Sequence, residues 1–542
     1  MIFAQVLNPD LFFVKPDTKV PGLKYGGKMF AKINSVGVFG MDGYAVDVEC
    51  SVSPGLPAFA TVGLPDAAVK ESQQRVTSAI TSVGFDFPLG KVVVNLAPGN
   101  IKKEGSGFDL PIALAILFAA GKIKCTDFSG EYAFIGELSL SGELRPVSGV
   151  LPMAVAAWKS GFKKIIVPQE NALEASVVKD INVYGAEDLR GVLAHICGEN
   201  TIMPTLSEKS LFDSQNIKYA YDFADVKGQT QAKRALEIAA AGGHNCLMVG
   251  TPGSGKTMLA QRIPSILPDM SFEEALEVTK IHSIAGTLPE KVPFMRVRPF
   301  RAPHHTVSTV SLTGGGRIPK PGEVSLAHGG VLFLDELPEF SKNALEVLRQ
   351  PVEDRKVTVS RVNATVTYPS NFMLITALNP CPCGYFGDKT HTCTCNPGQI
   401  QRYIGKLSGP LLDRIDLQLQ IKPVEYSSLT GSEKTESSSE IKKRVNAARE
   451  IQRRRYKNLG IYSNADLSSK DIEVFCELSP QSKQILESAF TRLGLSARAY
   501  TRIIKVARTI ADLDKKENIL PAHIAEAIGY RALDRSFFTS GK

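Results

Sequence analysis

The chain has 542 residues, of which 43% are hydrophobic and 22% charged, and its formal net charge is +8. This length exceeds what one hydrophobic core usually holds, so it predicts two to four domains. The composition excludes a membrane protein with helical spans, because the longest apolar segment, residues 110–120, is too short to cross a bilayer and predicts a buried helix. The positive charge favours polyanionic partners only mildly.

The first 28 residues show little patterning, and we interpret residues 1–28 as an extension before the first domain. They contain no basic leader, and Asp10 and Lys15 interrupt their apolar residues, so a secretory signal is not expected. Five of the nine cysteines are scattered singly, unlike a secreted disulfide framework. These features predict a cytoplasmic protein.

The first predicted domain, residues 29–199, mixes short β-branched strands with helices. Strands are expected at residues 91–96 and 164–168, and the mixture indicates an α/β unit. A polar linker, residues 200–216, leads to a second α/β domain, residues 217–425.

The second domain contains a complete phosphate-loop pattern between a predicted strand, residues 246–249, and a helix that opens at Met258. The eight residues are Gly250, Thr251, Pro252, Gly253, Ser254, Gly255, Lys256 and Thr257. Glycines in this pattern let backbone N–H groups surround phosphates, the lysine contacts the outer phosphates, and the threonine hydroxyl holds Mg²⁺. The pattern predicts an ATP site with Mg²⁺.

An apolar run at residues 331–334 predicts a buried strand that ends in Asp335 and Glu336. Two adjacent carboxylates by themselves are more often a solvated pair. Downstream of a phosphate loop, they favour a catalytic interpretation, in which Asp335 is a magnesium partner and Glu336 polarises a water molecule.

Four cysteines form two closely spaced CxC pairs, with His391 nearby. They are Cys381, Cys383, Cys393 and Cys395. Four thiolates suit tetrahedral Zn²⁺, although CxC is tighter than the usual CxxC spacing. The pattern predicts a structural zinc site, with free or redox-active thiols as the alternative.

A serine-rich flexible linker, residues 426–440, precedes a helical block, residues 441–542. Eight basic residues fall within the first predicted helix of this block: Lys442, Lys443, Arg444, Arg449, Arg453, Arg454, Arg455 and Lys457. They are dense enough to bind phosphates but equally able to form a solvated helix face, and both interpretations stay open.

Four long segments, residues 222–229, 300–306, 321–328 and 377–384, are more specific than the phosphate loop. Through them the chain resembles the YifB/ComM family of magnesium-chelatase-like AAA+ ATPases. The resemblance runs from Met29 to the C-terminal helices. It implies an N-terminal Lon-protease-like α+β domain, a three-layer α/β AAA+ domain and a C-terminal α-helical lid.

The family further implies a ring, with a homo-hexamer expected, in which ATP binds between neighbouring subunits. Asn379 follows a predicted strand at residues 372–377, at the place where such ATPases carry a sensor that orients the attacking water. The alternative for Asn379 is a turn asparagine.

Two arginines resemble residues that act on the nucleotide. Arg414 resembles the arginine finger, which in comparable hydrolases contributes roughly three to five orders of magnitude to the rate. Its alternative is a structural arginine paired with Asp413 or Asp416. Arg498 resembles the second sensor in the helical lid, and Arg502, one turn along, is the rival assignment.

The segment from Arg301 to His328 resembles an insertion that this branch directs toward the ring's pore. Its glycines at 314–316 with Arg317, and the neighbouring Lys320, predict a flexible basic loop.

Residues 356–362 and 364–368 alternate as the two strands of a hairpin. Hairpins at this position commonly line the pore, which makes Lys356 and Arg361 candidate DNA contacts. Exposed hairpin charges with no ligand are the alternative.

The N-terminal domain departs from the protease that it resembles. Gly107 stands where the serine nucleophile is expected, Ser106 is one position away, and Leu151 stands at the position of the partner lysine. We therefore expect a retained fold without the catalytic dyad or peptidase chemistry.

These features together predict an ATP hydrolase that works as a DNA motor. The resemblance implies a helicase that promotes branch migration during homologous recombination or natural transformation, with single-stranded or branched DNA as partner and no membrane. The alternatives are a magnesium chelatase-type motor and a protein-remodelling AAA+ ATPase. Gly107 and Leu151 make an ATP-dependent protease the least favoured function.

Overall fold

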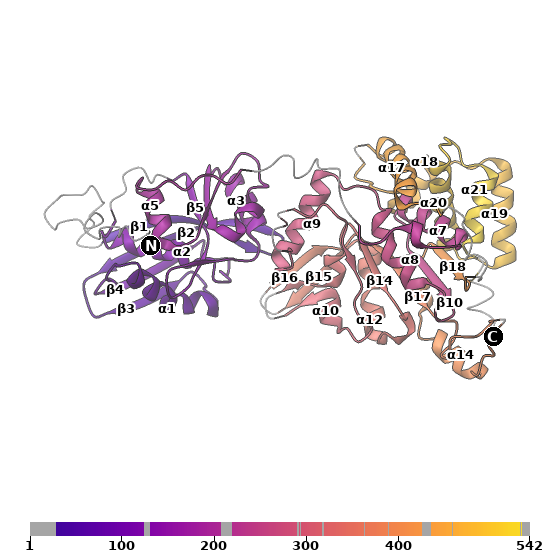
Figure 1. Ribbon diagram of the computed structural model, residues 1–542, viewed down its shortest axis with the longest axis horizontal. Helices are drawn as coiled ribbons and strands as arrows, with labels where there is room; N and C mark the ends of the chain where they lie inside the picture. Colours follow the sequence, from indigo (N-terminus) through magenta and orange to yellow (C-terminus); the bar gives the residue numbers. More distant parts are fainter. Residues whose placement is uncertain are drawn as a thin grey trace. The chain divides into compact units, whose positions relative to one another are not determined.

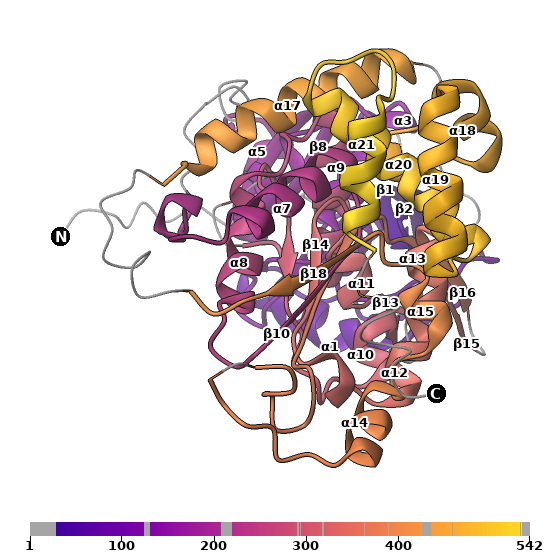
Figure 2. The same cartoon turned by 90° about the vertical axis from the view of Figure 1, so that its right-hand side faces the viewer.

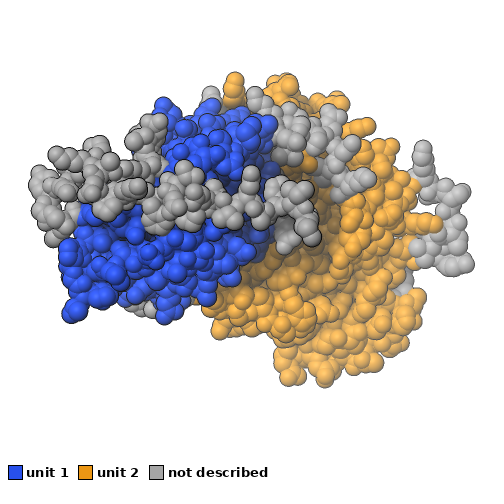
Figure 3. All heavy atoms as spheres, turned by 60° about the vertical axis from the view of Figure 1, so that its left-hand side comes forward, with its two compact units in different colours: residues 1–213, 279–295 blue, residues 214–278, 296–542 orange. Residues whose placement is uncertain are grey.

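The computed structural model describes residues 29–123, 130–206, 219–424, 435–531 and 533, apart from residues 290, 291, 293, 317, 318, 362, 363, 389 and 458. The expected extension at residues 1–28 lies outside the described residues. The chain divides into two compact units, coloured separately in Figure 3: residues 1–213 with 279–295, and residues 214–278 with 296–542. The described residues include no helix that is both long and apolar enough to cross a membrane.

The first unit contains a seven-stranded mixed sheet in the order β3-β4-β2-β1-β5-β8-β9. Its strands are β1 (Met29–Phe39), β2 (Asp42–Ser53), β3 (Ala58–Val62), β4 (Lys91–Ala97), β5 (Tyr132–Phe134), β8 (Lys164–Pro168) and β9 (Asn182–Ala186). β2 pairs antiparallel with β1 and β4, and the other neighbours are parallel. The strands expected at residues 91–96 and 164–168 are therefore confirmed as β4 and β8.

Helices pack on both faces of this sheet because strand residues alternate between two cores. In β5, Phe134 joins the core with α1 (Ala67–Ser82), α2 (Asp109–Ala119) and α5 (Leu189–Ile196). Its neighbour Ala133 joins the opposite core, with α3 (Val150–Lys159) and α4 (Ala172–Ala175). The apolar segment predicted to be a buried helix is α2, nearly every residue of which is buried.

The second unit contains a five-stranded sheet in the order β11-β14-β17-β10-β18, and all neighbours are parallel. The strands are β10 (Cys246–Gly250), β11 (Phe300–Arg301), β14 (Val331–Leu334), β17 (Met373–Leu378) and β18 (Leu417–Ile421), labelled in part in Figure 1. Their near-continuous apolar runs are typical of a sheet buried on both faces. The carboxyl ends of β10, β14 and β17 meet at one edge, which is where the predicted site residues follow.

The C-terminal helices share one hydrophobic core with this sheet. They are α17 (Ser438–Arg455), α18 (Ser469–Phe475), α19 (Pro480–Leu493), α20 (Ala497–Leu513) and α21 (Pro521–Gly529). Figure 2 shows α17, α20 and α21 beside α7 (Thr230–Gly242), against which α17 and α20 pack. α17 begins at Ser438, three residues before the boundary expected at 441, because Ser437 and Glu440 form a capping box.

Other elements of the second unit are shorter. The helices are α8 (Lys256–Arg262), α9 (Phe272–Ala285), α10 (Thr309–Thr313), α11 (Glu323–Leu326), α12 (Lys342–Val347), α13 (Arg349–Asp354), α14 (Pro397–Ile404) and α15 (Gly409–Leu412). The antiparallel pairs are β12 (Gly314–Gly315) with β13 (Lys320–Pro321), and β15 (Lys356–Arg361) with β16 (Ala364–Pro369). The second pair confirms the predicted hairpin. Residues 279–295, which include the end of α9, group with the first unit, inside the span expected for the second domain.

Candidate nucleotide-binding site

The predicted phosphate loop connects β10 to α8 at the carboxyl edge of the parallel sheet. Gly253 and Gly255 have φ angles of 75° and 91°, in the left-handed region that glycine adopts without a Cβ penalty. The loop therefore needs glycine at these two positions to turn from the strand into the helix.

Lys256 is the buried cation of this loop. Its Nζ donates to the carbonyl oxygens of Gly250 at 2.7 Å and Thr251 at 3.0 Å, and to Oδ1 of Asn379 at 3.0 Å. Burial lowers the pKa of Lys256, against the nearby charges of Asp335 and Glu336. The ammonium group is thus held between the loop and the predicted sensor, where phosphate oxygens would find a donor.

Thr257 and Asp335 lie together, as predicted for a magnesium site. The Thr257 hydroxyl donates to Oδ2 of Asp335 at 2.7 Å. A hydroxyl and a carboxylate supply the hard oxygen ligands that Mg²⁺ prefers, so these residues fit the ion. The other carboxylate oxygen of Asp335 accepts from the N–H of Glu336 at 2.9 Å, which fixes the turn after β14.

Glu336 has a φ angle of 51°, unusual for a residue with a side chain, and its carboxylate is half exposed. Its Oε2 lies 3.6 Å from Nδ1 of His305, a contact that the sequence did not predict. His305 follows β11, the strand next to β14, and stacks on His304 with ring centroids 4.0 Å apart. The segment that leads toward the predicted pore loop therefore touches the predicted catalytic base.

A mostly apolar cavity of about 150 Å³ adjoins the phosphate loop at Ser254 and Gly255. Val226, Met258 and Val424 also line it. The sequence did not predict these lining residues, because apolar side chains belong to no nucleotide-binding motif and are recognised only by their position beside the phosphate loop. The available signal was the position of residues 222–229 just before the nucleotide site.

The two predicted arginines lie away from this chain's phosphate loop. The carbonyl of Arg414 accepts from Nδ2 of Asn245 at 3.0 Å, and Asn245 directly precedes β10. At about 3.3 Å per residue, the five residues from Asn245 to Gly250 cover about 16 Å along the strand. Arg414 thus lies near the amino edge of the sheet and the phosphate loop at its carboxyl edge.

The Arg414 guanidinium contacts Glu353 and donates to the carbonyl of Pro410 at 2.7 Å. Burial and the charges of Arg498, Arg349 and Arg502 lower the pKa of Arg414. Several cations therefore gather at this edge, a combination that suits an incoming anion.

Arg498 and Arg502 differ in their surroundings. Arg498 is 59% exposed and lies 3.7 Å from Asp413, whereas Arg502 forms an ion pair with the buried carboxylate of Asp416. Burial opposes ionisation of Asp416, but Arg502 and His244 outweigh it and hold the pKa of Asp416 well below its usual value. The geometry gives Arg502 a structural partner and leaves Arg498 available.

The four predicted thiols come together after β17. The Sγ atoms of Cys381, Cys383, Cys393 and Cys395 all lie within 4.8 Å of one another. The measured Sγ–Sγ distances are 3.3 Å for 381 to 383, 3.7 Å for 381 to 393 and 3.6 Å for 383 to 393. A tetrahedron with Zn–S bonds of about 2.3 Å has sulfur edges of about 3.8 Å, so the cluster fits Zn²⁺.

Backbone N–H groups also face this cluster. Those of Tyr385 and Thr394 lower the pKa of the Cys383 thiol to about 5. Against a backbone N–H that lowers it, burial and the neighbouring thiols raise the pKa of both Cys393 and Cys395, so the four thiols do not titrate alike.

The basic residues of α17 largely serve the fold. Lys442 pairs with Asp269, Arg444 contacts Glu237 and Glu436, Arg449 donates to the carbonyls of Tyr462 and Ala240, and Arg455 pairs with the buried Asp512. Lys443, Arg453 and Arg454 are exposed on the helix, and the two arginines pair with Glu450. Lys457 is also exposed but lies beyond the end of α17 at Arg455. Four of the eight predicted cations are thus engaged within the fold, which reduces the charge left for a phosphate-binding face.

The two short hairpins contact each other. The Tyr368 hydroxyl on β16 donates to the carbonyl of Pro319 at 2.6 Å, and a Cβ on Gly315 would lie 2.7 Å from Nη2 of Arg361. Lys320, Lys356 and Arg361 are exposed, whereas Arg317 lies outside the described residues. Three of the four predicted basic contacts are therefore presented by one connected element.

The positions compared with the protease dyad carry no such chemistry. A Cβ on Gly107 would meet Ile135 and Val147, and Ser106, one position earlier, contacts Glu137. Leu151 is fully buried in α3 and donates its backbone N–H to Glu174 at 2.9 Å. Neither Gly107 nor Leu151 supplies a nucleophile or a base.

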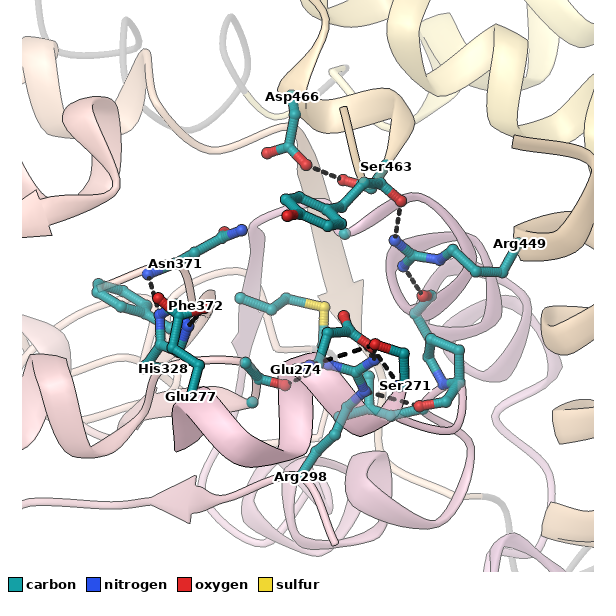
Figure 4. A pocket seen from close by; sticks show the side chains of 18 of the residues that line it. Ser271, Glu274, Glu277, Arg298, His328, Asn371, Phe372, Arg449, Ser463 and Asp466 are labelled. Carbon is teal, nitrogen blue, oxygen red and sulfur yellow. Dashed lines mark hydrogen bonds and ion pairs between the residues drawn. The ribbon is translucent and has the colours of Figure 1, made fainter. Parts of the chain in front are cut away.

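A larger polar cavity of about 170 Å³ lies near the amino ends of β14 and β17, away from the phosphate loop (Figure 4). Arg298 crosses it to Glu274 at 3.1 Å and to the carbonyl of Gly329 at 2.6 Å. Arg449 enters from α17, and burial with the charge of Arg298 lowers its pKa to about 10. Arg298 thus ties α9 to the loop before β14, and Arg449 ties α17 to α7, so the cavity is part of the packing between these elements.

A parallel sheet with this strand order, a phosphate loop after its first strand, acidic residues after β14 and an asparagine after β17 are typical of an AAA+ type ATPase. Three family profiles match the chain. "Subunit ChlI of Mg-chelatase" matches residues 48–171, "Magnesium chelatase, subunit ChlI" matches residues 222–429, and "Magnesium chelatase, subunit ChlI C-terminal" matches residues 435–531.

Two relatives cover nearly the whole chain. It is 44% identical to YifB of Escherichia coli over 93% of this chain and 97% of that protein. It is also 44% identical to the competence protein ComM of Haemophilus influenzae, over 92% and 96%. The chain belongs to the YifB/ComM family of magnesium-chelatase-like AAA+ ATPases.

The N-terminal unit also has a more distant relative. The chain is 30% identical to the Lon protease of Halothermothrix orenii over 168 residues, which cover 29% of this chain and 21% of that protein. The expected Lon-like similarity is thereby confirmed, whereas the loss of the dyad at Gly107 and Leu151 stays a prediction.

Proposed function

We propose that the protein is an ATP-driven DNA motor that assembles as a ring, with a homo-hexamer expected, and promotes branch migration in recombination or natural transformation. The observation that carries the proposal is the division of catalytic groups between the two edges of one sheet. Lys256, Glu336 and Asn379 lie at the carboxyl edge, and Arg414 lies near the amino edge. An arginine finger here needs a second subunit to reach a nucleotide.

Each residue has a role in the proposed hydrolysis. The phosphate loop and Lys256 bind the phosphates of ATP, and the cavity beside Met258 receives the base. Thr257 and Asp335 would hold Mg²⁺, which shields phosphate charge when bound. Glu336 accepts a proton from the attacking water, and Asn379 orients that water molecule. Arg414 of a neighbouring subunit stabilises charge on the leaving phosphates, with Arg498 as second sensor.

DNA is the substrate that the surface and the relatives favour. The connected hairpins expose Lys320, Lys356 and Arg361, which match a phosphate backbone in charge. The relative from Haemophilus influenzae is named a competence protein, and competence concerns the uptake of DNA. We place this activity in the cytoplasm, where cysteine thiols stay reduced.

We also propose that the four-cysteine cluster binds one structural Zn²⁺. Its sulfur spacing fits a tetrahedral ion. Metal analysis of protein purified without chelator tests this directly. About one equivalent of zinc supports the proposal, and less than about half contradicts it.

The test of the motor is the ATPase rate with and without single-stranded, duplex and forked DNA across a salt series. We expect forked or single-stranded DNA to stimulate hydrolysis and rising salt to remove the stimulation, since backbone contacts release counterions. Strand displacement should vanish in Lys256→Ala, which loses nucleotide binding, and in Glu336→Gln, which keeps it. A purified assembly that neither binds nor remodels forked DNA at low salt would falsify the DNA motor.

One observation favours a second function, a magnesium chelatase-type motor. All three matching family profiles are named for a chelatase subunit. However, YifB and ComM match along nearly the whole chain, including the Lon-like unit. Protein remodelling is the remaining alternative, because basic hairpins also accept an acidic polypeptide. Stimulation of hydrolysis by an unfolded protein, but not by DNA, would favour it.

A further inference from the structure

The loop that carries the four thiols lies directly against the phosphate loop. We call residues 381–395 the thiol knuckle. Gly384 within it has a φ angle of 89°, and a Cβ there would lie 2.6 Å from both Cγ and Cδ of Pro252. Carbon atoms in contact normally lie about 3.5–4.0 Å apart, so the knuckle backbone packs on the proline ring with no room for a methyl group.

Both ends of the knuckle also lead to the nucleotide site. At its start, Cys381 is two residues after Asn379, whose Oδ1 accepts from Lys256 at 3.0 Å. At its end, Cys395 is followed by α14, which carries the buried Tyr403. Burial raises the pKa of the Tyr403 hydroxyl, and the neighbouring backbone of Asn379 partly opposes the rise, which places the two residues side by side. The knuckle is therefore joined to the phosphate loop by its middle and to the sensor by its two ends.

Apart from the thiols, the knuckle is held by contacts within the loop, such as the stacked rings of Tyr385 and His391, whose centroids lie 4.7 Å apart. Its described residues, 381–388 and 390–395, form neither helix nor strand. Cys381 is buried, whereas the other three cysteines are partly exposed. Asp388 caps a local turn by accepting from Thr390 at 2.6 Å and His391 at 2.9 Å, but these bonds stay within the loop. A metal ion that joins Cys381 and Cys383 to Cys393 and Cys395 would close it.

We propose that the zinc-bound knuckle is a positioning element of the nucleotide site. Through Gly384 it packs on Pro252, and through Cys381, two residues after Asn379, it holds the predicted sensor beside Lys256. Loss of the ion loosens the knuckle and weakens nucleotide binding. This inference rests on the zinc site proposed above and is independent of DNA as the substrate.

Two glycines of the knuckle provide a matched pair of variants. Gly384 and Gly387 have similar positive φ angles, 89° and 79°, so alanine brings similar backbone strain at both. They differ in what the new methyl group meets: the Pro252 ring at 384, and open space at 387. Only Gly384→Ala should therefore push the knuckle and the phosphate loop apart.

The experiment measures zinc content, melting temperature and the affinity for a fluorescent ADP analogue with Mg²⁺ in the full-length protein. We expect Gly384→Ala to keep its zinc and to bind the analogue about tenfold more weakly, since overpacking against a rigid ring displaces it. Gly387→Ala should keep its zinc and stay within about twofold of the wild type. The double variant Pro252→Ala/Gly384→Ala, which removes the atoms that clash, should bind more tightly than Gly384→Ala.

A second arm removes the ion from the wild-type protein with a zinc-selective chelator. Affinity for the analogue should fall about tenfold and return when Zn²⁺ is added back. If Gly384→Ala also loses zinc, the chelator experiment on the wild-type protein decides whether the knuckle and the nucleotide site are coupled. Unchanged affinity in zinc-free wild type, or in zinc-loaded Gly384→Ala, overturns the coupling. A wild-type protein that never contains zinc contradicts the proposed metal site. The ATPase measurements with DNA test the DNA motor independently of both results.

Discussion

The imidazole Nδ1 of His305 lies 3.6 Å from the carboxylate Oε2 of Glu336, and this contact joins the segment before the predicted pore loop to the predicted catalytic base. The same ring lies edge-on to Phe340, with centroids 6.4 Å apart. A carboxylate engaged by a neighbouring donor is less available to accept a proton from water.

His305→Ala should therefore raise the basal ATPase rate measured without DNA. The gain should not exceed about fivefold, because a polar contact this exposed contributes about 1 kcal/mol or less. The measurement is a steady-state phosphate-release assay beside His304→Ala, which removes the stacked ring but not the contact with Glu336. A basal rate that falls in His305→Ala would mean that the histidine supports Glu336 instead of restraining it.

Arg414→Ala should bind nucleotide normally and hydrolyse it about a thousandfold more slowly, because an arginine finger acts on the transition state. Mixing two variants in one assembly tests whether Arg414 acts on the nucleotide of a neighbouring subunit. Lys256→Ala lacks its own nucleotide site but keeps Arg414, so mixing it with Arg414→Ala should restore part of the activity. Mixtures no more active than the separate variants would contradict a finger that acts between subunits.

Arg498→Ala should lower the ATPase rate, whereas Arg502→Ala should lower the stability of the fold. Removing Arg502 takes the arginine from the buried carboxylate of Asp416, which keeps His244 and the N–H of Asn245, so the cost should lie near or below the lower end of the roughly 3–5 kcal/mol typical of a broken buried ion pair. Arg498 is 59% exposed, so its removal should leave the melting temperature nearly unchanged and lower kcat instead. Calorimetry and ATPase assays on both variants check this, and a reversed pattern would exchange the two assignments.

The buried carboxylate of Asp416 also predicts that the folded protein loses stability at acidic pH. Its pKa is lower in the folded chain than in the unfolded one, so its contribution to stability is complete above the unfolded value of about 3.9 and declines as the pH falls below it. Asp416→Asn should be less stable than the wild type at pH 7, with a smaller difference at pH 3. Denaturant unfolding at both pH values measures this. An equal difference at both would assign the stabilisation to packing.

The hairpin cations should bind DNA and the α17 cations should not. The double variant Lys356→Ala/Arg361→Ala should weaken forked-DNA binding and reduce the salt slope by about one unit for each lost phosphate contact. Arg453→Ala/Arg454→Ala removes the same charge from α17, where both arginines pair with Glu450. Equal weakening in the two double variants would show that net charge, rather than the hairpin, attracts DNA.

Much of the fold and the nucleotide site followed from local patterns. The strands at residues 91–96 and 164–168, the buried α2, the hairpin β15–β16 and the neighbourhood of Lys256, Thr257 and Asp335 agree with expectation. Each depends on residues that are close in sequence or that follow adjacent parallel strands. Alternation and turn chemistry carry such information directly.

The long-range contacts were not predictable in this way. Arg444 meets Glu237, about two hundred residues away in sequence, and Arg455 meets Asp512, so part of the basic helix, for which a phosphate-binding and a solvated face were equally open, is bound internally. His305 and Glu336, and Gly384 and Pro252, likewise have no pattern that links them. Such pairs form only when whole helices, strands and loops pack together, and a short stretch of sequence does not show which elements will pack.

The sequence alone thus determined the chemistry of this protein: a phosphate loop, an acidic strand end, a sensor and four thiols, each specified by residue types at fixed spacing. The tertiary structure decided how these parts are connected. It separated Arg414 from its own chain's phosphate loop by the length of a strand, gave Arg502 a buried partner, and set the thiol knuckle against Pro252. The physical reason is that binding chemistry resides in local groups, whereas coupling between sites depends on contacts that exist only after the sheet, helices and loops have packed.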